Sequence, residues 1–271
     1  MVFPRCLALV LAVALPLFPQ ASRVPSQASP APTIDGRSDD WPAAAFGRDA
    51  KSGAECAFRN DGHDLYILFI VRDAKARESL ASTGLAVLAG KAKARKFDRG
   101  VLCLERAVPA ETAILWREGQ GELLTDAEKA KIRETPTRDL RLTFAIGRGG
   151  SVQGPLRRLR SSEPPEFAIG EEPDATTYEI KVPLAPPDLV PGGLGITPGQ
   201  TVRIAFEWGG ASRKVLGART NRETPPSESG GLFGVATPAQ DFLNMFDPMS
   251  RPTMGTKEFS FRLDIRLAEA R

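Results

Sequence analysis

Histidine is nearly absent from this chain of 271 residues, and His63 is the only one. A serine or cysteine nucleophile normally needs a histidine base, and His63 follows the turn residues Asn60, Asp61 and Gly62 with no nucleophile motif around it. Carboxylates are plentiful enough for paired-carboxylate hydrolysis, but the sequence singles out no pair by its setting. We therefore expect a chain that binds a ligand without catalysis.

Long apolar runs are also scarce, and the one near the N-terminus is Cys6–Phe18. Arg5 precedes this run, which is too short to cross a bilayer as a stable helix, so the segment has the organisation of a secretory signal peptide. No cysteine follows the run at the position of a bacterial lipid anchor. We expect an exported protein of the periplasm or the extracellular space, with no membrane span.

The chain divides into three segments on this basis. Residues 1–28 hold the signal peptide and the start of a tether, because Ser22–Pro32 is rich in proline, serine and alanine and has little apolar surface to bury. Residues 29–33 serve as a linker. Residues 34–271 have the length of one large all-β domain.

Neither sign of charge dominates the sequence. Lysine and arginine number 36 against 33 aspartate and glutamate residues, which gives a formal net charge of +3. Removal of a leader that contains Arg5 and Arg23 brings the balance closer to neutral. This balance gives no reason to expect nucleic acid or an anionic membrane as the partner.

Cysteine is rare as well, with three in the chain. Cys6 leaves with the signal peptide, whereas Cys56 and Cys103 remain in strand-like segments. An oxidising compartment permits a disulfide between these two, and the alternative is two buried free thiols. Two cysteines alone do not make a metal site, so we expect no metal.

Alternating hydrophobicity predicts a β-rich fold. Phe259, Phe261 and Leu263 point to one side of the segment Lys257–Leu267, while Leu65–Val71 is apolar on both sides, as in a central strand whose outer face is covered. Further strand candidates are Gly84–Ala89, Gly100–Glu105, Thr112–Arg117, Leu140–Ile146, Thr176–Pro183 and Thr201–Trp208. Their spacing predicts an antiparallel two-sheet β-sandwich of the jelly-roll or immunoglobulin-like kind.

Two segments depart from the strand pattern. A short helix is predicted at Asp126–Glu134, because Thr125 and Glu128 have the spacing of a capping box and Pro136 follows. Gly209–Thr256 is a long stretch rich in glycine, proline and serine that nevertheless carries several phenylalanines and methionines. These apolar residues either pack the segment onto the sheet or form a contact surface.

Four segments together resemble a known family. They are Ile34–Trp41 (IDGRSDDW), the strand-turn-strand run Ala57–Asp73, Tyr178–Leu184 and Val202–Glu207. In order and spacing they are similar to family 9 carbohydrate-binding modules, which have a DOMON-type β-sandwich, over most of residues 33–268. The resemblance implies an exported domain that binds an oligo- or polysaccharide. It also implies structural calcium, although no cluster of oxygen ligands in this sequence fits a calcium loop.

The sugar-binding positions of that family are altered here. Its members hold a terminal sugar between two tryptophans, but Ala74–Gly84, where one is expected, contains no aromatic residue. The second position offers Phe242 and Phe246 in place of tryptophan.

Other aromatic residues supply candidates for a binding site. Trp208 ends a predicted strand beside Glu207 and two glycines, so we expect the ring to stack on a sugar and Glu207 to accept its hydroxyls. Phe246 closes the other side, and Trp116 on the predicted strand Thr112–Arg117 is a further candidate. Ordinary core packing is the alternative for both tryptophans.

Two other functions compete with sugar binding. The apolar loop at residues 232–249 makes a protein-interaction or structural role the main alternative, with another exported protein as the partner. A remote alternative is a haem-binding sandwich, for which His63 with Met245, Met249 or Met254 supplies the available axial ligands.

Overall fold

The computed structural model describes most of the predicted domain. The described residues are 22–23, 31–41, 47–49, 52–147, 152–156, 164–209 and 258–269. The predicted signal peptide, Phe246, the loop at residues 232–249 and the three methionines of the haem alternative lie outside the described residues.

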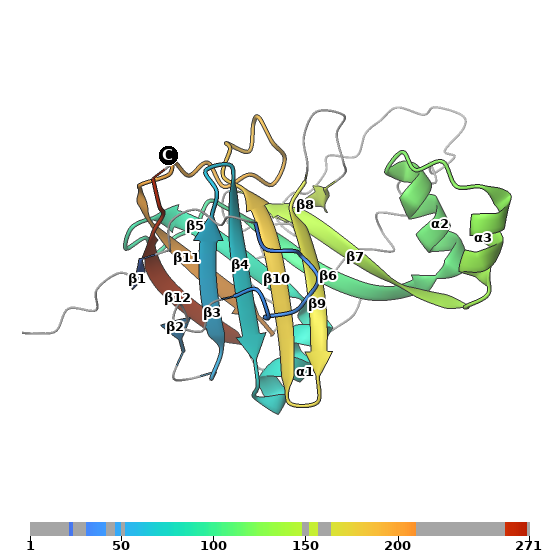
Figure 1. Cartoon of the computed structure of the whole chain (residues 1–271), viewed down its shortest axis with the longest axis horizontal. Helices are drawn as coiled ribbons and strands as arrows, with labels where there is room; N and C mark the ends of the chain where they lie inside the picture. The colour runs from blue at the N-terminus through green and yellow to red at the C-terminus, as the bar shows by residue number, and fades with distance from the viewer. Residues whose placement is uncertain are drawn as a thin grey trace, which may run out of the picture.

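Twelve strands and three helices occur within these ranges (Figure 1). The strands are β1 (Ser22–Arg23), β2 (Gly47–Arg48), β3 (Glu55–Asn60), β4 (Asp64–Val71), β5 (Leu85–Lys91), β6 (Arg99–Pro109), β7 (Thr137–Ile146), β8 (Val152–Pro155), β9 (Glu166–Glu172), β10 (Ala175–Pro183), β11 (Thr201–Trp208) and β12 (Phe259–Arg266). The helices are α1 (Ala74–Thr83), α2 (Ala110–Gly119) and α3 (Asp126–Arg133). No helix of the described part is long and apolar enough to cross a membrane.

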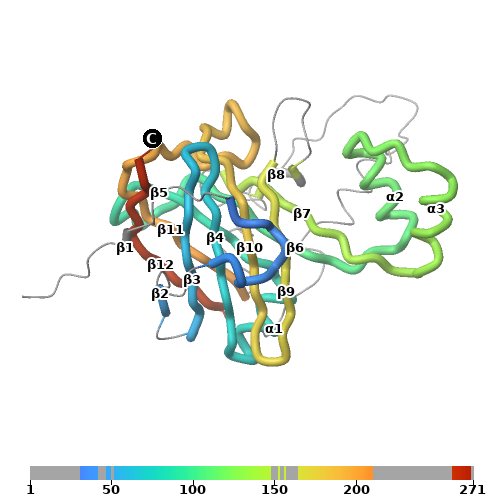
Figure 2. Tube along the Cα trace, viewed as in Figure 1, coloured from blue at the N-terminus to red at the C-terminus, as the bar shows by residue number. Residues whose placement is uncertain are grey.

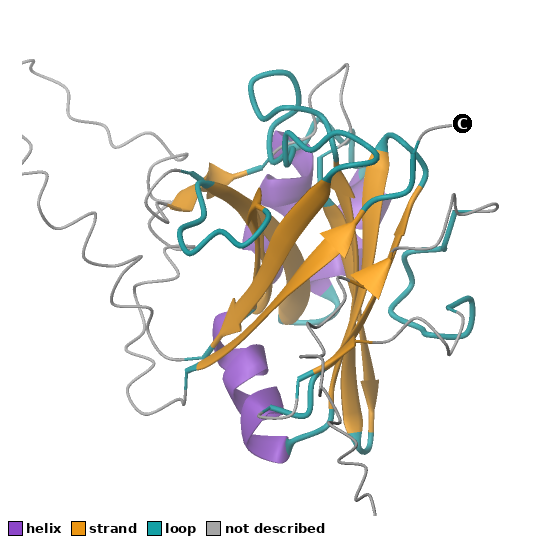
Figure 3. Ribbon diagram, turned by 90° about the vertical axis from the view of Figure 1, so that its left-hand side faces the viewer, coloured by secondary structure: helices purple, strands orange, loops and turns teal. Residues whose placement is uncertain are grey.

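The strands form two sheets that pack face to face (Figure 3). The seven-stranded sheet has the order β1-β12-β11-β5-β6-β7-β8, and the five-stranded sheet has the order β2-β3-β4-β10-β9. Neighbouring strands are antiparallel except for the two-residue β1, which runs parallel to β12 within the segment predicted as a tether. The predicted antiparallel β-sandwich is confirmed.

The main core lies between the two sheets. The rings of Phe69 on β4 and Phe206 on β11 stack with centroids 4.6 Å apart, and Phe206 also stacks on Phe261 of β12. The alternation predicted for β12 is present, since Phe259, Phe261 and Ile265 are buried while Ser260, Arg262 and Arg266 are exposed. The odd-numbered residues of β11 face away from this core, and one of them, Ala205, is buried in a small apolar cluster with Leu88 and Ile146 on the outer face of the sheet.

The outer face of the five-stranded sheet is covered by the chain that precedes it. Trp41 packs with Tyr66, Leu68 and Ile70 of β4 in a second apolar cluster, together with Ile34. This contact explains why β4 is apolar on both faces, as its sequence predicted. Gly36 has a φ of +87°, and a Cβ there would lie 2.6 Å from the backbone nitrogen of Gly170, so the turn requires glycine.

A helical arm, residues 110–134, extends from one end of the sandwich (Figures 1 and 2). β6 and β7 pair continuously from Gly100↔Ile146 to Pro109↔Thr137 and carry α2 and α3 at their far end. A separate core supports the arm, built from residues of both strands and both helices, among them Leu104, Ile114 and Leu142.

The structure has two helices that the sequence did not predict, α1 and α2, and α2 replaces a predicted strand. The predicted strand Thr112–Arg117 is wrong, because this segment lies within α2. The buried residues of α2 are Ala110, Thr112, Ala113, Ile114 and Trp116. Thr112, Ile114 and Trp116 alternate as in a strand, but Ala110, Ala113 and Ile114 have the spacing of one helix face, so this short pattern fits both structures. The single predicted helix is α3, confirmed with its Thr125–Glu128 capping box, and α1 is a third helix that begins after its N-cap Asp73.

Cys56 and Cys103 are buried free thiols, so the disulfide alternative is not formed. Cys56 on β3 lies close to Leu263 of β12, because the Cβ position of Gly47 is 3.6 Å from side-chain atoms of both. Cys103 is on β6, three strand positions from β12 in the seven-stranded sheet. β12 and β6 are thus about 14 Å apart across their sheet, and the two cysteines lie in different sheets.

Candidate functional site

Trp208 lies in the main core, with 2% of its surface exposed. Its ring stacks on Phe259 with centroids 5.2 Å apart, and it makes an edge contact with Phe69. The indole Nε1 donates a hydrogen bond of 3.1 Å to the carbonyl of Ala76 in α1. An indole enclosed in this way has no open face for a sugar, so the structure favours the core alternative at this position.

Trp116 lies on α2 rather than on a strand, and 8% of its surface is exposed. It belongs to the separate core of the helical arm. The structure therefore does not bring Trp116 together with Trp208 or Glu207.

Glu207 faces away from the core, next to Trp208 in sequence but on the opposite side of the sheet. Its Oε1 accepts a hydrogen bond of 3.3 Å from Arg262 Nη2 on the neighbouring strand β12. The guanidinium of Arg262 in turn lies 5.5 Å from the centre of the Phe97 ring. A carboxylate, a guanidinium and an aromatic ring thus meet on the outer face of the seven-stranded sheet.

Phe97 reaches this face because the loop between β5 and β6 folds back over the sheet. Residues 91–99, here called the basic loop, are held by two contacts with the outer residues of β11 and β12. The backbone nitrogen of Lys93 donates to Asp264 Oδ1 at 3.1 Å, and Arg203 Nη1 donates to the carbonyl of Ala94 at 3.3 Å.

Arg203 and Asp264 also bind each other through two hydrogen bonds, of 2.8 and 2.7 Å. This paired contact lowers the pKa of Asp264, chiefly through the hydrogen bond from Arg203, against a smaller opposing effect of burial. The pair is one-quarter exposed or less on each side, so solvent screens it less than a fully exposed ion pair. It fixes both strands and the basic loop in one arrangement.

Two backbone features allow the loop to approach so closely. A Cβ on Gly90 would lie 3.0 Å from the Ala94 Cβ and 3.2 Å from the Phe97 ring, so a larger residue would push the loop away from the sheet. Lys93 has a φ of +60°, and it is the one non-glycine residue of the described part with a positive φ. Such a conformation costs about 1 kcal/mol, which the surrounding contacts must offset.

We call this surface the β11–β12 face: the basic loop together with Arg203, Glu207, Arg262 and Asp264. Sequence reasoning identified Glu207, and the alternation predicted for Lys257–Leu267 leaves Arg262 and Asp264 on the side opposite Phe259 and Phe261. It did not identify Phe97 or the basic loop. The local sequence Lys91–Arg99 (KAKARKFDR) could have indicated this surface, because five basic residues surround one phenylalanine there.

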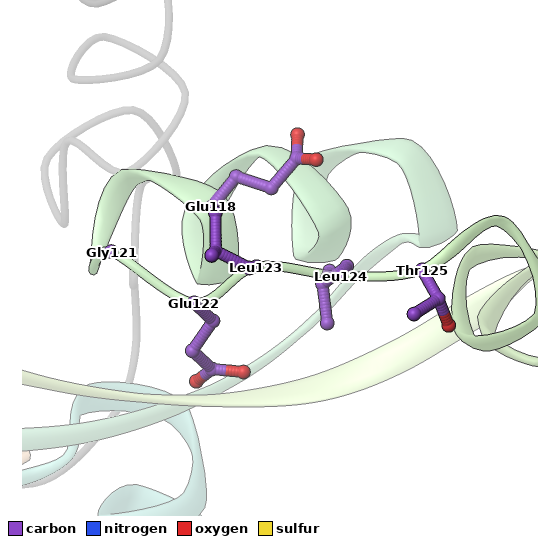
Figure 4. Close-up of a pocket in the computed structure, with 6 residues that line it drawn as sticks. All are labelled: Glu118, Gly121, Glu122, Leu123, Leu124 and Thr125. Carbon is purple, nitrogen blue, oxygen red and sulfur yellow. The ribbon is translucent and has the colours of Figure 1, made fainter.

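The other candidate groups lie elsewhere. Within the described ranges, no three His, Cys, Asp or Glu side chains gather where they could hold a metal ion. His63 lies in the turn between β3 and β4, where its backbone nitrogen donates to Asp61 Oδ1. On the helical arm, a depression is lined by Glu118, Gly121, Glu122, Leu123, Leu124 and Thr125 (Figure 4).

Comparisons with known proteins give no family for this chain. No family model matches the chain, and no curated protein matches it. Two solved structures of a family 9 carbohydrate-binding module from Caldicellulosiruptor kristjanssonii, one with glucose and one with cellotriose, are 14% identical to the chain. Each covers 69% of this chain and 76% or 75% of its own, with TM-scores of 0.29 and 0.28. The class defined by the chain's own strands is an antiparallel two-sheet β-sandwich, to which these modules bear a distant likeness.

Proposed function

We propose that this chain is a non-catalytic, exported binding domain whose ligand is a carbohydrate, bound on the β11–β12 face. One observation carries the proposal: Glu207, Arg262 and Phe97 lie together on an outward sheet surface. Carboxylates and guanidinium groups exchange hydrogen bonds with sugar hydroxyls. Phe97 supports this surface from beneath, because its ring lies under the guanidinium of Arg262 and packs against the apolar cluster of Leu88, Ile146 and Ala205.

The contacts made without ligand are easy to replace. Glu207 and Arg262 bind each other at 3.3 Å, with 30% and 44% of their side chains exposed. An exposed ion pair of this kind contributes about 0–1 kcal/mol, so exchanging it for hydrogen bonds to hydroxyls costs little. The two groups are also already positioned on rigid neighbouring strands, which reduces the entropy lost on binding.

The proposal is tested by calorimetric titration of the chain, without its leader, against a panel of soluble oligosaccharides. We expect at least one saturable interaction, weakened about tenfold in both Glu207→Gln and Arg262→Gln, because each loses a charged hydrogen-bond partner. Glu166→Gln, on the exposed side of β9 in the other sheet, is the matched control. Unchanged affinity in both face variants would exclude this surface as the binding site.

A protein-interaction role is the second candidate, and the helical arm favours it. Leu123 is 97% exposed and Leu115 is 57% exposed on an arm that projects from the sandwich (Figure 1). The double variant Leu115→Ser/Leu123→Ser tests this role in pull-downs from an extract of exported proteins. A partner retained by the parent chain and lost with this variant, together with a flat oligosaccharide titration, would favour this second candidate.

A further inference from the structure

We propose that the ligand of the β11–β12 face is an acidic polysaccharide, and that the basic loop recognises its carboxylate groups. This inference rests on the proposed function and specifies its ligand class. It starts from the charge of the basic loop, which has five basic residues and one acidic residue in nine positions.

The cations of the loop are accessible. Lys91, Lys93, Arg95 and Lys96 are all exposed. No ion pair among the described residues involves the side chain of Lys91, Arg95 or Lys96. Cations without a carboxylate partner are available to an anionic ligand at no cost of breaking an existing pair.

The neighbouring acids are already engaged. Asp264 accepts hydrogen bonds from Nε and Nη2 of Arg203 and from the Lys93 backbone, and Asp98 is paired with Arg99 at 3.1 Å. Arg262 and Arg266 on the outer side of β12 are each paired with one carboxylate, of Glu207 at 3.3 Å and of Glu269 at 3.8 Å, so these pairs add no net charge. The face therefore presents an excess of positive charge to solvent, although the whole chain has a formal net charge of only +3.

The loop is also preorganised. Its fold depends on the Asp264 and Arg203 contacts, on the space above Gly90 and on the positive φ of Lys93. A strained loop held by several contacts is expected where a fixed arrangement of side chains is used for binding. A merely solubilising run of lysines would not need such anchoring.

The geometry favours a glycan over a membrane or a nucleic acid. Phe97 is half-buried beneath Arg262, so it cannot insert into a bilayer as the apolar side chains of membrane-binding surfaces do. The same ring has one face occupied by a guanidinium and is the single aromatic of the loop, whereas single-stranded nucleic acids are bound by series of open aromatic faces. The carboxylates of an acidic sugar can pair with the cations of the basic loop, and its hydroxyls can donate hydrogen bonds to Glu207.

The test compares two polymers with one backbone. Oligogalacturonates carry a carboxylate on each residue, and their fully methyl-esterified forms do not. We expect the leaderless chain to bind the charged oligomers at least tenfold more tightly than the esterified ones, with an affinity that falls as salt rises from 50 to 200 mM.

The variant Arg95→Gln/Lys96→Gln removes two unpaired cations without touching a contact of the fold. At about fivefold per cation near an anionic surface, we expect it to lose about 25-fold in affinity for oligogalacturonate. Lys75→Gln/Lys131→Gln removes the same charge from exposed positions on α1 and α3, and it should bind like the parent. Equal melting temperatures show that both variants are folded.

The outcomes separate the two proposals. Equal binding of charged and esterified oligomers would overturn the acidic-ligand inference and leave carbohydrate binding intact. No binding of either form, together with a flat neutral panel, would overturn both. Tighter binding to phosphatidylglycerol vesicles or to single-stranded DNA than to oligogalacturonate, lost in Arg95→Gln/Lys96→Gln, would keep the basic site and overturn its assignment to a glycan.

Discussion

The indole Nε1 of Trp41 donates a hydrogen bond of 2.6 Å to Oε1 of Glu179, a residue 138 positions later in the chain. The other oxygen of Glu179 accepts from the backbone nitrogens of Asp35, Gly36 and Arg37, at 2.9, 2.8 and 3.3 Å. Glu179 itself is fully buried. One carboxylate on β10 therefore fastens the N-terminal turn and the tryptophan onto the outer face of the five-stranded sheet.

Glu179→Gln is expected to destabilise the domain, because every partner of this carboxylate is a donor. Burial raises the pKa of Glu179, and the hydrogen bonds oppose that effect. Whichever way the glutamine amide turns, its NH2 group meets either the Trp41 indole or the backbone donors. We expect a loss of about 2 kcal/mol in the free energy of unfolding, measured by urea denaturation.

The matched control is Glu171→Gln, which makes the same change at an exposed position of β9. It should change the free energy of unfolding by less than about 0.5 kcal/mol. An equal effect of the two substitutions would mean that the N-terminal turn adds no stability through Glu179.

Sequence patterns predicted the sandwich from the alternation in β12 and from short apolar runs bounded by turn residues, such as β4. β11 and β12 were placed within two residues, and the capping box located α3. The strand predicted at Thr112–Arg117 failed because periodicity over six residues does not separate a strand from an amphipathic helix. The helical arm therefore had no sequence counterpart beyond α3.

The candidate site was harder to predict, because it is assembled from distant segments. Phe97, Glu207 and Arg262 meet only after the β5–β6 loop folds back over β11 and β12. The balanced net charge also hid the basic loop, since averaging over the chain removes a local excess. Trp208 shows the opposite error, because an aromatic residue at a strand end looks identical in sequence whether it faces the core or the solvent.

Asp264→Asn is expected to remove a pH-dependent part of the stability. The pKa of Asp264 is lowered in the folded state, so its contribution is present above the unfolded value, near 3.9, and is lost as pH falls through the folded value. We expect the variant to be about 1–2 kcal/mol less stable than the parent at pH 7. The difference should shrink as the pH is lowered below 4, measured by urea denaturation across this range.

Asp139→Asn is the control, at an exposed position of β7. The Asp264 variant has a second expected effect, because it releases the Lys93 backbone from its anchor. Its affinity for oligogalacturonate should fall although it gains net positive charge. Tighter binding in this variant would show that loop charge alone, without its fixed conformation, determines affinity.

The variant Trp208→Phe tests whether Trp208 stabilises the core or binds the sugar. The substitution keeps an aromatic ring against Phe259 but removes the hydrogen bond to the Ala76 carbonyl and part of the packed volume. We expect a loss of about 1–3 kcal/mol in stability, with sugar affinity unchanged in the folded variant. A tenfold loss of affinity without a comparable loss in the Glu207→Gln variant would instead place the sugar at Trp208.

Cys56 and Cys103 are expected to remain reduced even in an oxidising compartment. Burial raises the pKa of Cys56 to about 12 and raises the pKa of Cys103 as well, so neither thiol forms the reactive thiolate at neutral pH. Ellman's reagent should label neither residue in the folded, leaderless chain within minutes and should label both in 6 M guanidinium chloride.

The same chain purified from the periplasm provides the decisive comparison, because it has been exposed to disulfide-forming enzymes. Mass spectrometry after alkylation in denaturant should find two modified cysteines, since their strands hold the two sulfurs on separate parts of the core. A periplasmic chain two mass units lighter and resistant to alkylation would show a disulfide. It would require β3 to lie nearer β6 than the sheet order places it.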